Sequence, residues 1–412
     1  MKYDVAVLGA GMVGVASAIH LQRRGLSVVL VDRREPGLET SFGNAGIIQR
    51  EAVRPYACPR APGEVLSVLG NRRLDVRYHP ADMPALAPRL MRYYRNSATG
   101  RYAEICDAYA SLTALALDTH ATLLRDTEAD ALIERRGFLM LMRTAVRRDE
   151  AFIEADEVAE RFGVTHRKLD GAELAALEPG LAGRHAGAVH WTQPWTVRDP
   201  GALVRAYAQL FLREGGRFVH GDAATLRRGA NWEVATFEGD ALRADRAVIA
   251  LGPWSPSLTR RFGYAPSLFV KRGYHMHYAP LPERRLGHWI LDAERGYLIA
   301  PMQRGVRLTT GAELAAIESP ATPLQLDAAE RVARQVFPLG ERVDEMPWKG
   351  NRPCMADMLP VIGELPGHAG LWAAFGHGHQ GFTLGPATGE LLAAAMQGER
   401  TAVDITPFAV RR

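Results

Sequence analysis

Three glycines near the amino terminus have the spacing G-x-G-x-x-G, at Gly9, Gly11 and Gly14. Gly9 permits a tight turn, Gly11 lets the backbone approach a pyrophosphate, and Gly14 lets a helix pack closely against a strand. The first amides of that helix attract negative charge. Asp32 follows at the end of a second apolar stretch, where its carboxylate can accept from both hydroxyls of a ribose. These residues predict dinucleotide binding.

The strands and the helix that must position these residues can also be predicted from the sequence. Residues 3–8 form a short apolar stretch that predicts a strand, residues 12–24 have helical spacing, and residues 27–31 predict a second strand. Strand, glycine turn, helix, second strand and acid all lie at the offsets of a Rossmann-like βαβ unit. The motif alone does not separate NAD from FAD.

The segment after Asp32 favours FAD. Residues 37–49, "GLETSFGNAGIIQ", are irregular where an NAD-type domain would continue in further βα units. Such a segment suits a cofactor that lies extended along the domain. Ser41 and nearby amides can donate to the pyrophosphate, while Asn44 and Gly46 can pass close to a bulky ring system without a side-chain clash.

A second glycine-rich turn lies near the carboxyl terminus. A predicted strand over residues 371–375 runs into a turn that contains Gly378 and opens a helix. The amides of Gly381, Phe382 and Thr383 can stabilise the negative charge that a reduced flavin carries near its pyrimidine edge.

Two histidines, His377 and His379, belong to this turn. They have no carboxylate or cysteine partner at a ligand spacing, so no metal site is predicted. We expect His379 to face the substrate pocket and His377 to be a hydrogen-bonded structural residue.

Composition limits the remaining classes of function. The chain has 412 residues, a hydrophobic fraction of 47% and a net charge of +4, which favours two domains. No basic run is interleaved with aromatic residues, so nucleic acid is not expected as a partner. The three cysteines are far apart, which suits a reducing compartment.

The amino terminus resembles a signal peptide only superficially, because Asp4 interrupts it and glycines are dense. No stretch reaches the roughly 18 to 20 apolar residues of a membrane helix. We expect a cytoplasmic protein, either free or bound peripherally to the inner face of the cell membrane.

The same motifs carry a family resemblance. "ETSFGNAG" resembles the E-T-S-x-x-N-A-G stretch of bacterial D-amino-acid dehydrogenases, which belong to the D-amino-acid oxidase/glycine oxidase class of FAD-dependent oxidoreductases. "GNRP" resembles their G-x-R-P motif, and Arg352 falls on the arginine that holds the substrate carboxylate. A guanidinium fork matches a carboxylate geometrically, which a lysine cannot do.

The resemblance implies further site residues. Tyr274 and Tyr297 lie in strands that roof the pocket and help to bind or shield the substrate, and Arg272 is a further candidate beside them. Around the adenosine end, the resemblance implies contacts from Arg33, Ala223 and Gly252.

The resemblance also bears on how FAD is held. Monomeric sarcosine oxidases attach their flavin through a cysteine, and Gly350 falls on that position in this chain. Cys354 lies four residues further on. Non-covalent FAD is therefore expected.

The predicted fold class is α/β: a Rossmann-like FAD-binding domain with a glutathione-reductase-like βαβ unit, plus an α+β substrate domain built on an antiparallel sheet. Residues 264–340 alternate like antiparallel strands and end in an amphipathic helix. We assign 1–83, 151–263 and 341–412 to the FAD-binding domain. The substrate-binding domain takes 84–150 and 264–340.

The resemblance implies oxidative deamination of D-amino acids, D-proline or a hydroxy-D-proline included. Hydride passes from the α-carbon to flavin N5, and the electrons pass to a quinone or another acceptor. Three alternatives stay open: a glycine- or sarcosine-type amine oxidase that uses O₂, the catalytic subunit of a heteromeric dehydrogenase, and a flavoprotein that assists assembly without turnover. Arg352 argues against the last, which needs no carboxylate clamp. The sequence leaves open the substrate side chain, the acceptor, the oligomeric state and any partner subunit.

Overall fold

The computed structural model describes residues 2–410. It begins with the predicted βαβ unit, formed by β1 (Lys2–Leu8), α1 (Met12–Gln22) and β2 (Val28–Asp32). The two strands are parallel neighbours, with Val5 opposite Val28. Asp32 therefore ends its strand at the carboxyl edge of the sheet, beside the glycine turn.

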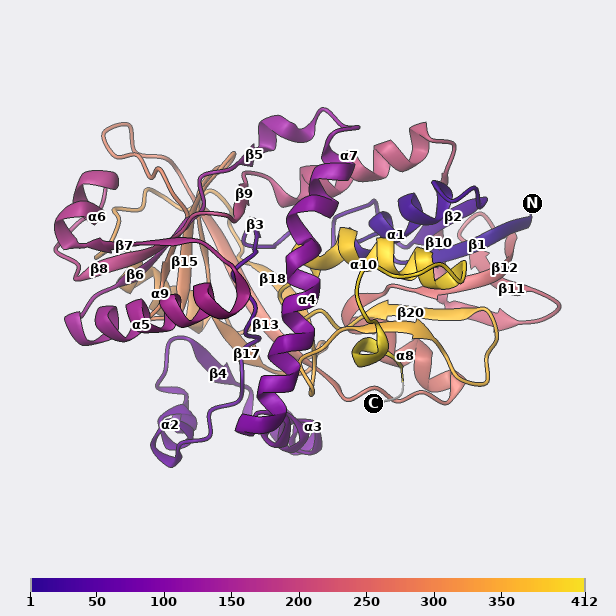
Figure 1. The fold of residues 1–412 in the computed structure, drawn as a ribbon, viewed down its shortest axis with the longest axis horizontal. Coiled ribbons are helices and arrows are strands. Elements are labelled where there is room, and N and C mark those ends of the chain that lie inside the picture. Colours follow the sequence, from indigo (N-terminus) through magenta and orange to yellow (C-terminus); the bar gives the residue numbers. More distant parts are fainter. Residues whose placement is uncertain (1, 411–412) are drawn as a thin grey trace.

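In the described residues, β1 and β2 belong to a seven-stranded sheet that joins distant parts of the chain (Figure 1). Parallel pairing links β10 to β2, β12 to β1 and β20 to β12. The other two strands, β11 and the edge strand β19, pair antiparallel. The added strands are β10 (Arg217–Arg228), β11 (Trp232–Thr236), β12 (Ala241–Ile249), β19 (Val361–Glu364) and β20 (Leu371–Phe375).

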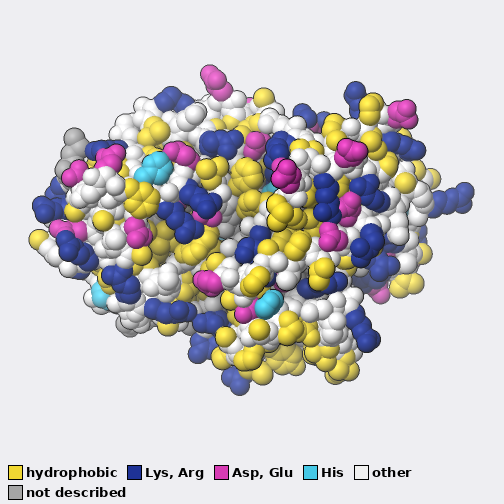
Figure 2. Space-filling view, turned by 180° about the vertical axis from the view of Figure 1, so that it is seen from behind, with side chains coloured by type: hydrophobic (Ala, Val, Ile, Leu, Met, Phe, Trp, Pro, Cys, Tyr) yellow, Lys and Arg dark blue, Asp and Glu magenta, His cyan; other side chains and the backbone are white. Residues whose placement is uncertain are grey.

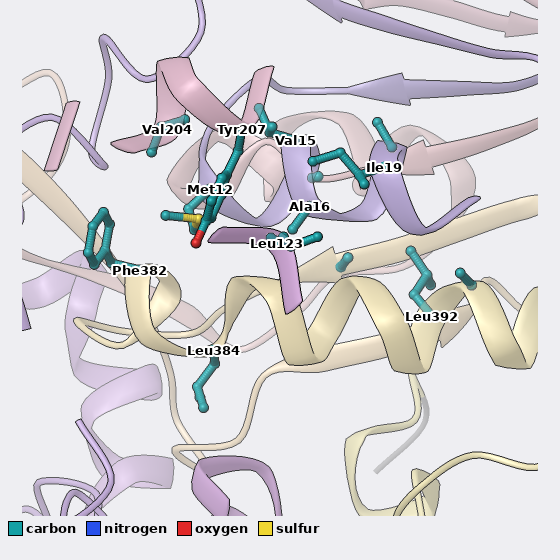
Figure 3. Close-up of a cluster of buried hydrophobic side chains, with 14 of the residues drawn as sticks. Met12, Val15, Ala16, Ile19, Leu123, Val204, Tyr207, Phe382, Leu384 and Leu392 are labelled. Carbon is teal, nitrogen blue, oxygen red and sulfur yellow. The ribbon is translucent and has the colours of Figure 1, made fainter. Parts of the chain in front are cut away.

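Helix α1 packs against α10 (Gly381–Met396) from the far end of the chain (Figure 3). Met12, Val15 and Ile19 of α1 and Leu384 and Leu392 of α10 belong to one buried apolar cluster. Helices α4 (Thr99–Leu124) and α7 (Pro200–Arg213) complete this layer. Asp199 caps α7 by accepting a hydrogen bond from the Ala202 N–H, at 2.8 Å.

A second sheet of ten strands is mostly antiparallel and occupies the other end of the molecule (Figure 1). Its centre is β13, which pairs with β16, β17 and β18. The ten strands are β4 (Val76–Tyr78), β6 (Phe138–Met142), β7 (His166–Asp170), β8 (Gly187–Trp191), β13 (Leu268–Tyr278), β14 (Ile290–Asp292), β15 (Tyr297–Met302), β16 (Gly305–Thr309), β17 (Ala312–Leu314) and β18 (Trp348–Met355).

Shorter elements connect or cover the two sheets. A small sheet contains β3 (Ile47–Ile48), β5 (Ile133–Glu134) and β9 (Trp195–Val197). The remaining α-helices are α2 (Pro62–Val68), α3 (Met83–Asn96), α5 (Ala145–Phe162), α6 (Gly171–Leu177), α8 (Ser255–Thr259) and the predicted amphipathic helix α9 (Leu324–Ala333). Among the helices of residues 2–410, none is both long and apolar enough to cross a membrane.

The sheet membership differs from the predicted domain boundaries. Strands β7 and β8, assigned to the FAD-binding part, pair with β6 in the ten-stranded sheet. Likewise β4 and β18 pair with β17 and β13. Conversely, α4 packs against α10 in the layer that covers the seven-stranded sheet. Local pattern predicts that a strand forms, but its sheet is chosen by pairing with residues far away in the sequence.

Candidate active site

A cavity of about 1180 Å³ runs from the carboxyl edge of the seven-stranded sheet to the face of the ten-stranded sheet. Ligand pockets usually measure about 300–1,000 Å³. The volume therefore suits a large cofactor together with a small substrate.

The turn at one end of this cavity requires glycine at two of its positions. Gly9 has φ +109°, and a Cβ on Gly14 would lie 1.7 Å from the Gly9 carbonyl oxygen. Gly11 lines the cavity beside Ser41, whose Oγ accepts from the Met12 N–H at 3.1 Å. The Ser41 hydroxyl can therefore still donate toward an anion at the helix terminus.

Asp32 lies on the cavity wall next to this turn. One carboxylate oxygen accepts from the Ala10 N–H at 2.6 Å and the other from the Arg34 N–H at 3.1 Å. Oxygen lone pairs remain available for ribose hydroxyls. The carboxylate thus shapes the glycine turn as well as facing the cavity.

The predicted adenosine contacts gather at the same end. Arg33, Ala223 and Gly252 all line the cavity. The Arg33 guanidinium lies 4.5 Å from the centre of the Trp254 ring and pairs with Glu39 at 2.8 Å. Arg33 is thereby held flat against the wall.

The segment around Asn44 and Gly46 is held by its own hydrogen bonds. Asn44 Oδ1 accepts from the Gly46 N–H at 2.8 Å, and the Asn44 side chain lines the cavity. Gly46 itself lies behind the wall, because a Cβ there would approach the Val197 carbonyl oxygen to 2.4 Å. The prediction that Gly46 clears space for a ring is wrong: it clears space for the strand β9.

At the start of α10, Gly378, Gly381 and Phe382 line the cavity. Thr383 does not. Its hydroxyl donates to the Ile47 carbonyl at 3.2 Å and accepts from the Gln49 N–H at 3.3 Å. The hydroxyl therefore fastens the helix start to the segment over residues 37–49, a positioning role, while the predicted contact of the Thr383 backbone amide with the cofactor stays a prediction.

Arg352 lines the cavity, and within residues 2–410 no ion pair links its guanidinium to a carboxylate. Its two terminal nitrogens donate to the backbone carbonyls of Gly311 at 2.6 Å and Thr310 at 3.1 Å. Burial lowers the pKa of this guanidinium, although an arginine stays charged at neutral pH. A half-buried cation whose partners among the described residues are neutral is a site for an anion.

Arg272 does not reach the cavity, so its predicted substrate contact is wrong. Its fully buried guanidinium pairs with Glu313 at 2.7 Å and donates to the carbonyls of Ser319 and Pro320. Successive residues of a strand point to opposite faces of the sheet. Consequently it is the preceding residue, Lys271, that faces the cavity.

Tyr274 and Tyr297 lie in strands that form the cavity wall, but Tyr274 projects from the same face of β13 as Arg272, and both hydroxyls are already engaged. The Tyr274 hydroxyl donates to Glu313 at 2.8 Å, and the Tyr297 hydroxyl accepts from Arg143 at 3.2 Å. Burial raises the pKa of both phenols. Both rings belong to the apolar cluster that packs against α9 on the face of the sheet opposite Lys271, so the predicted shielding of the site and binding of a carboxylate do not fit this arrangement.

His379 lines the cavity, with its ring centre 5.0 Å from that of Tyr56. Burial, aided by the charges of Arg352 and Lys271, lowers the pKa of His379 to about 3, so its imidazole is neutral at physiological pH. His377 is buried and bonds through Nε2 to the Thr388 hydroxyl at 2.9 Å, a structural role. Within residues 2–410 no three His, Cys, Asp or Glu side chains form a possible metal site.

The family model described as FAD dependent oxidoreductase matches residues 4–395. The chain belongs to this family. Its residues fit the cofactor: a glycine turn at a helix start, an acid at the end of β2, and a second helix start at the far end of the same cavity. This FAD-dependent oxidoreductase would hold the pyrophosphate near Gly11 and Ser41 and the adenosine near Asp32.

Relatives extend over the full length of the oxidoreductase. It is 30% identical to a D-amino-acid oxidase of Bradyrhizobium diazoefficiens over 99% of this chain and 98% of that protein. It is 31% identical to a D-amino acid dehydrogenase of Chromohalobacter salexigens, covering 97% of each. The crystal structure of glycine oxidase from Geobacillus kaustophilus superposes with a TM-score of 0.74, at 25% identity, over 100% of this chain and 99% of that one.

Gly350 supports the prediction that FAD is bound without a covalent bond to the protein. A Cβ at Gly350 would lie 2.1 Å from the Trp348 ring, so a cysteine does not fit there. The thiols of Cys58 and Cys354 line the cavity, and burial raises the pKa of both, which disfavours the reactive thiolate. Acid precipitation of the holoenzyme should therefore release the yellow colour into the supernatant. Colour that stays in the pellet would indicate a covalent link. Release of that colour from the Cys354→Ser variant would assign the link to Cys354.

Several residues that line the cavity were not predicted from the sequence, among them Lys271, Tyr56 and Gln49. The alternation of β13 was the usable signal for Lys271. Gln49 connects the cavity to a buried acid, because its amide donates to Glu51, and the second carboxylate oxygen of Glu51 has no partner within the described residues.

Burial raises the pKa of Glu51 to about 7. Below the ordinary pKa the acid is protonated in both folded and unfolded states, and between that value and pH 7 the folded state binds more protons. Stability should therefore fall as pH rises through this window and level off above it. Glu51→Gln should remove the fall and gain roughly 3 kcal/mol of unfolding free energy at pH 8, with little gain at pH 4.5.

Thermal and denaturant unfolding at the two pH values measure this difference. The exposed acid Glu154 supplies the control variant Glu154→Gln, which should leave the pH dependence intact. An equal change at both pH values in Glu51→Gln would mean that the pKa of Glu51 is the same in the folded and the unfolded protein.

Proposed function

We propose that this oxidoreductase removes hydride from the α-carbon of a D-amino acid and passes the electrons to an acceptor other than O₂. The unpaired guanidinium of Arg352, aimed into the cavity that the flavin-binding segments share, carries the proposal. The names of relatives from Bradyrhizobium diazoefficiens and Chromohalobacter salexigens support the same substrate class. The βαβ unit and the irregular segment after it suit an extended, glutathione-reductase-like placement of FAD.

The chain's own residues bind and orient the substrate in this proposal. Arg352 pairs with the α-carboxylate through its fork, which fixes the α-carbon relative to the cofactor. Because the imidazole of His379 is neutral, it does not repel a substrate that arrives with a protonated amino group. Bound FAD supplies the hydride acceptor, and the start of α10 offers amide groups to negative charge at that end of the cavity.

The acceptor is proposed to be a quinone, reached from a cytoplasmic protein that contacts the membrane peripherally. Apolar side chains gather on the lobe formed by α2 and α3 (Figure 2), where Leu66, Leu69 and Met91 are exposed. Val65 and Leu69 of the same lobe also line the cavity. These apolar side chains suit contact with a lipid surface, and they suit an apolar acceptor better than a water-soluble acceptor.

Anaerobic bleaching of the flavin tests the proposal. D-amino acids, D-proline and hydroxy-D-proline should reduce the bound FAD, whereas their L-enantiomers should not. Reduced enzyme should then be reoxidised faster by a quinone or dye than by air, and pelleting with lipid vesicles tests the membrane contact. Bleaching by glycine or sarcosine alone, with rapid peroxide formation in air, would favour the amine-oxidase alternative. Co-purifying subunits that are needed for reoxidation would favour the heteromeric one.

A further inference from the structure

A second cation lies beside Arg352 in the cavity. Lys271 of β13 is directly opposite Arg352 of β18 in the antiparallel register, so both side chains project from the same face of the sheet. Both line the cavity. The sheet therefore presents a pair of positive charges to whatever occupies this end of the site.

Neither cation is neutralised by the protein. Within residues 2–410 no ion pair links either one to a carboxylate. The Lys271 ammonium donates to the Tyr93 hydroxyl at 3.0 Å and lies 4.5 Å from the centre of its ring. Arg352 bonds only to backbone carbonyls. By contrast, Arg272 on the opposite face of the same strand is paired with Glu313.

Lys271 keeps its charge in this setting. Burial opposes the charge, but the interactions with Tyr93, Cys354 and Cys58 outweigh it and raise the pKa of the ammonium. Like charges directly opposite each other across two strands destabilise a sheet. A fold that holds two such cations against a cavity gains from a ligand with negative charge at both positions.

We propose that Lys271 and Arg352 together select a substrate with two negative groups: a D-amino acid whose side chain ends in a carboxylate. The proposal rests on the proposed D-amino-acid oxidation. The fork of Arg352 takes the α-carboxylate and the point charge of Lys271 takes the side-chain carboxylate. Residues such as Tyr93 then pack against the stem between the two charges.

The test compares acids with their amides, which have the same shape and lack the charge. kcat/KM for D-glutamate and D-aspartate should exceed that for D-glutamine and D-asparagine by at least about tenfold. In Lys271→Met this ratio should fall to near one, while D-glutamine and D-alanine change little. Lys271→Arg should restore part of the preference.

Lys349→Met is the matched control. Lys349 lies on the strand β18 and is not part of the cavity wall, so its loss should leave the acid-to-amide ratio unchanged. The inference is overturned if the wild type does not prefer the acids. It is also overturned if Lys271→Met slows D-alanine as much as D-glutamate, since both cations would then share one carboxylate.

Binding to the oxidised holoenzyme separates this inference from the proposed function. Glutarate should perturb the flavin spectrum at a concentration at least about tenfold lower than butyrate does, and Lys271→Met should abolish that difference. Such binding without bleaching by any D-amino acid would refute the proposed function and leave the two-cation site standing. Equal affinity for glutarate and butyrate would refute the site itself.

Discussion

Replacing Arg352 by alanine is expected to lower kcat/KM for the best D-amino acid by about a hundredfold or more. The lost charge-assisted fork in a partly dry cavity costs roughly 3 kcal/mol of transition-state binding. FAD content should stay near that of the wild type, because Arg352 is assigned to the substrate and lies in the ten-stranded sheet, whereas Asp32 and the glycine turn belong to the seven-stranded sheet. Steady-state kinetics and the flavin-to-protein ratio measure both effects.

The variant Arg352→Lys sharpens the result. A lysine keeps the charge but lacks the fork, so it should rescue poorly. Near-native kcat/KM in either variant would remove Arg352 from the clamp. Arg272 is then no substitute, because its guanidinium is buried against Glu313, and Lys271 would be the remaining cation beside it on the cavity wall.

The second large effect is expected at Asp32. Asp32→Ala should raise the dissociation constant for FAD by at least about tenfold, because it removes charge-assisted bonds to the ribose. The same change frees the Ala10 N–H, which the carboxylate holds at 2.6 Å beside the glycine turn. Titration of the apoprotein with FAD, followed by flavin fluorescence, measures the constant.

Asp32→Asn separates the two roles of this carboxylate. The amide oxygen can still accept from Ala10, so the fold of the turn should persist while FAD binding weakens. Asp245, an exposed acid paired with Lys2, provides the control Asp245→Ala. Full FAD occupancy in Asp32→Ala at limiting FAD, with an unchanged circular dichroism spectrum, would exclude Asp32 from the cofactor site.

The sequence alone determined the parts of this protein whose signals are local. The strand, glycine turn, helix and acid from β1 to Asp32 lie where their spacing predicts them. The same holds for the helix α10 that follows the second glycine turn. In each case a few neighbouring residues determine the backbone conformation. The groups that could bind the cofactor then lie at the end of a strand or at the start of a helix.

Only the tertiary structure decided which strands share a sheet and which side chains face the cavity. Local alternation predicted antiparallel strands within residues 264–340, but not that β7 and β8 join the same sheet, because pairing depends on partners far along the chain. On β13 a shift of one residue exchanges the two faces, so Lys271 and not Arg272 enters the site. The hydroxyl of Tyr274 is taken by Glu313 from another strand, a competition that no local pattern records.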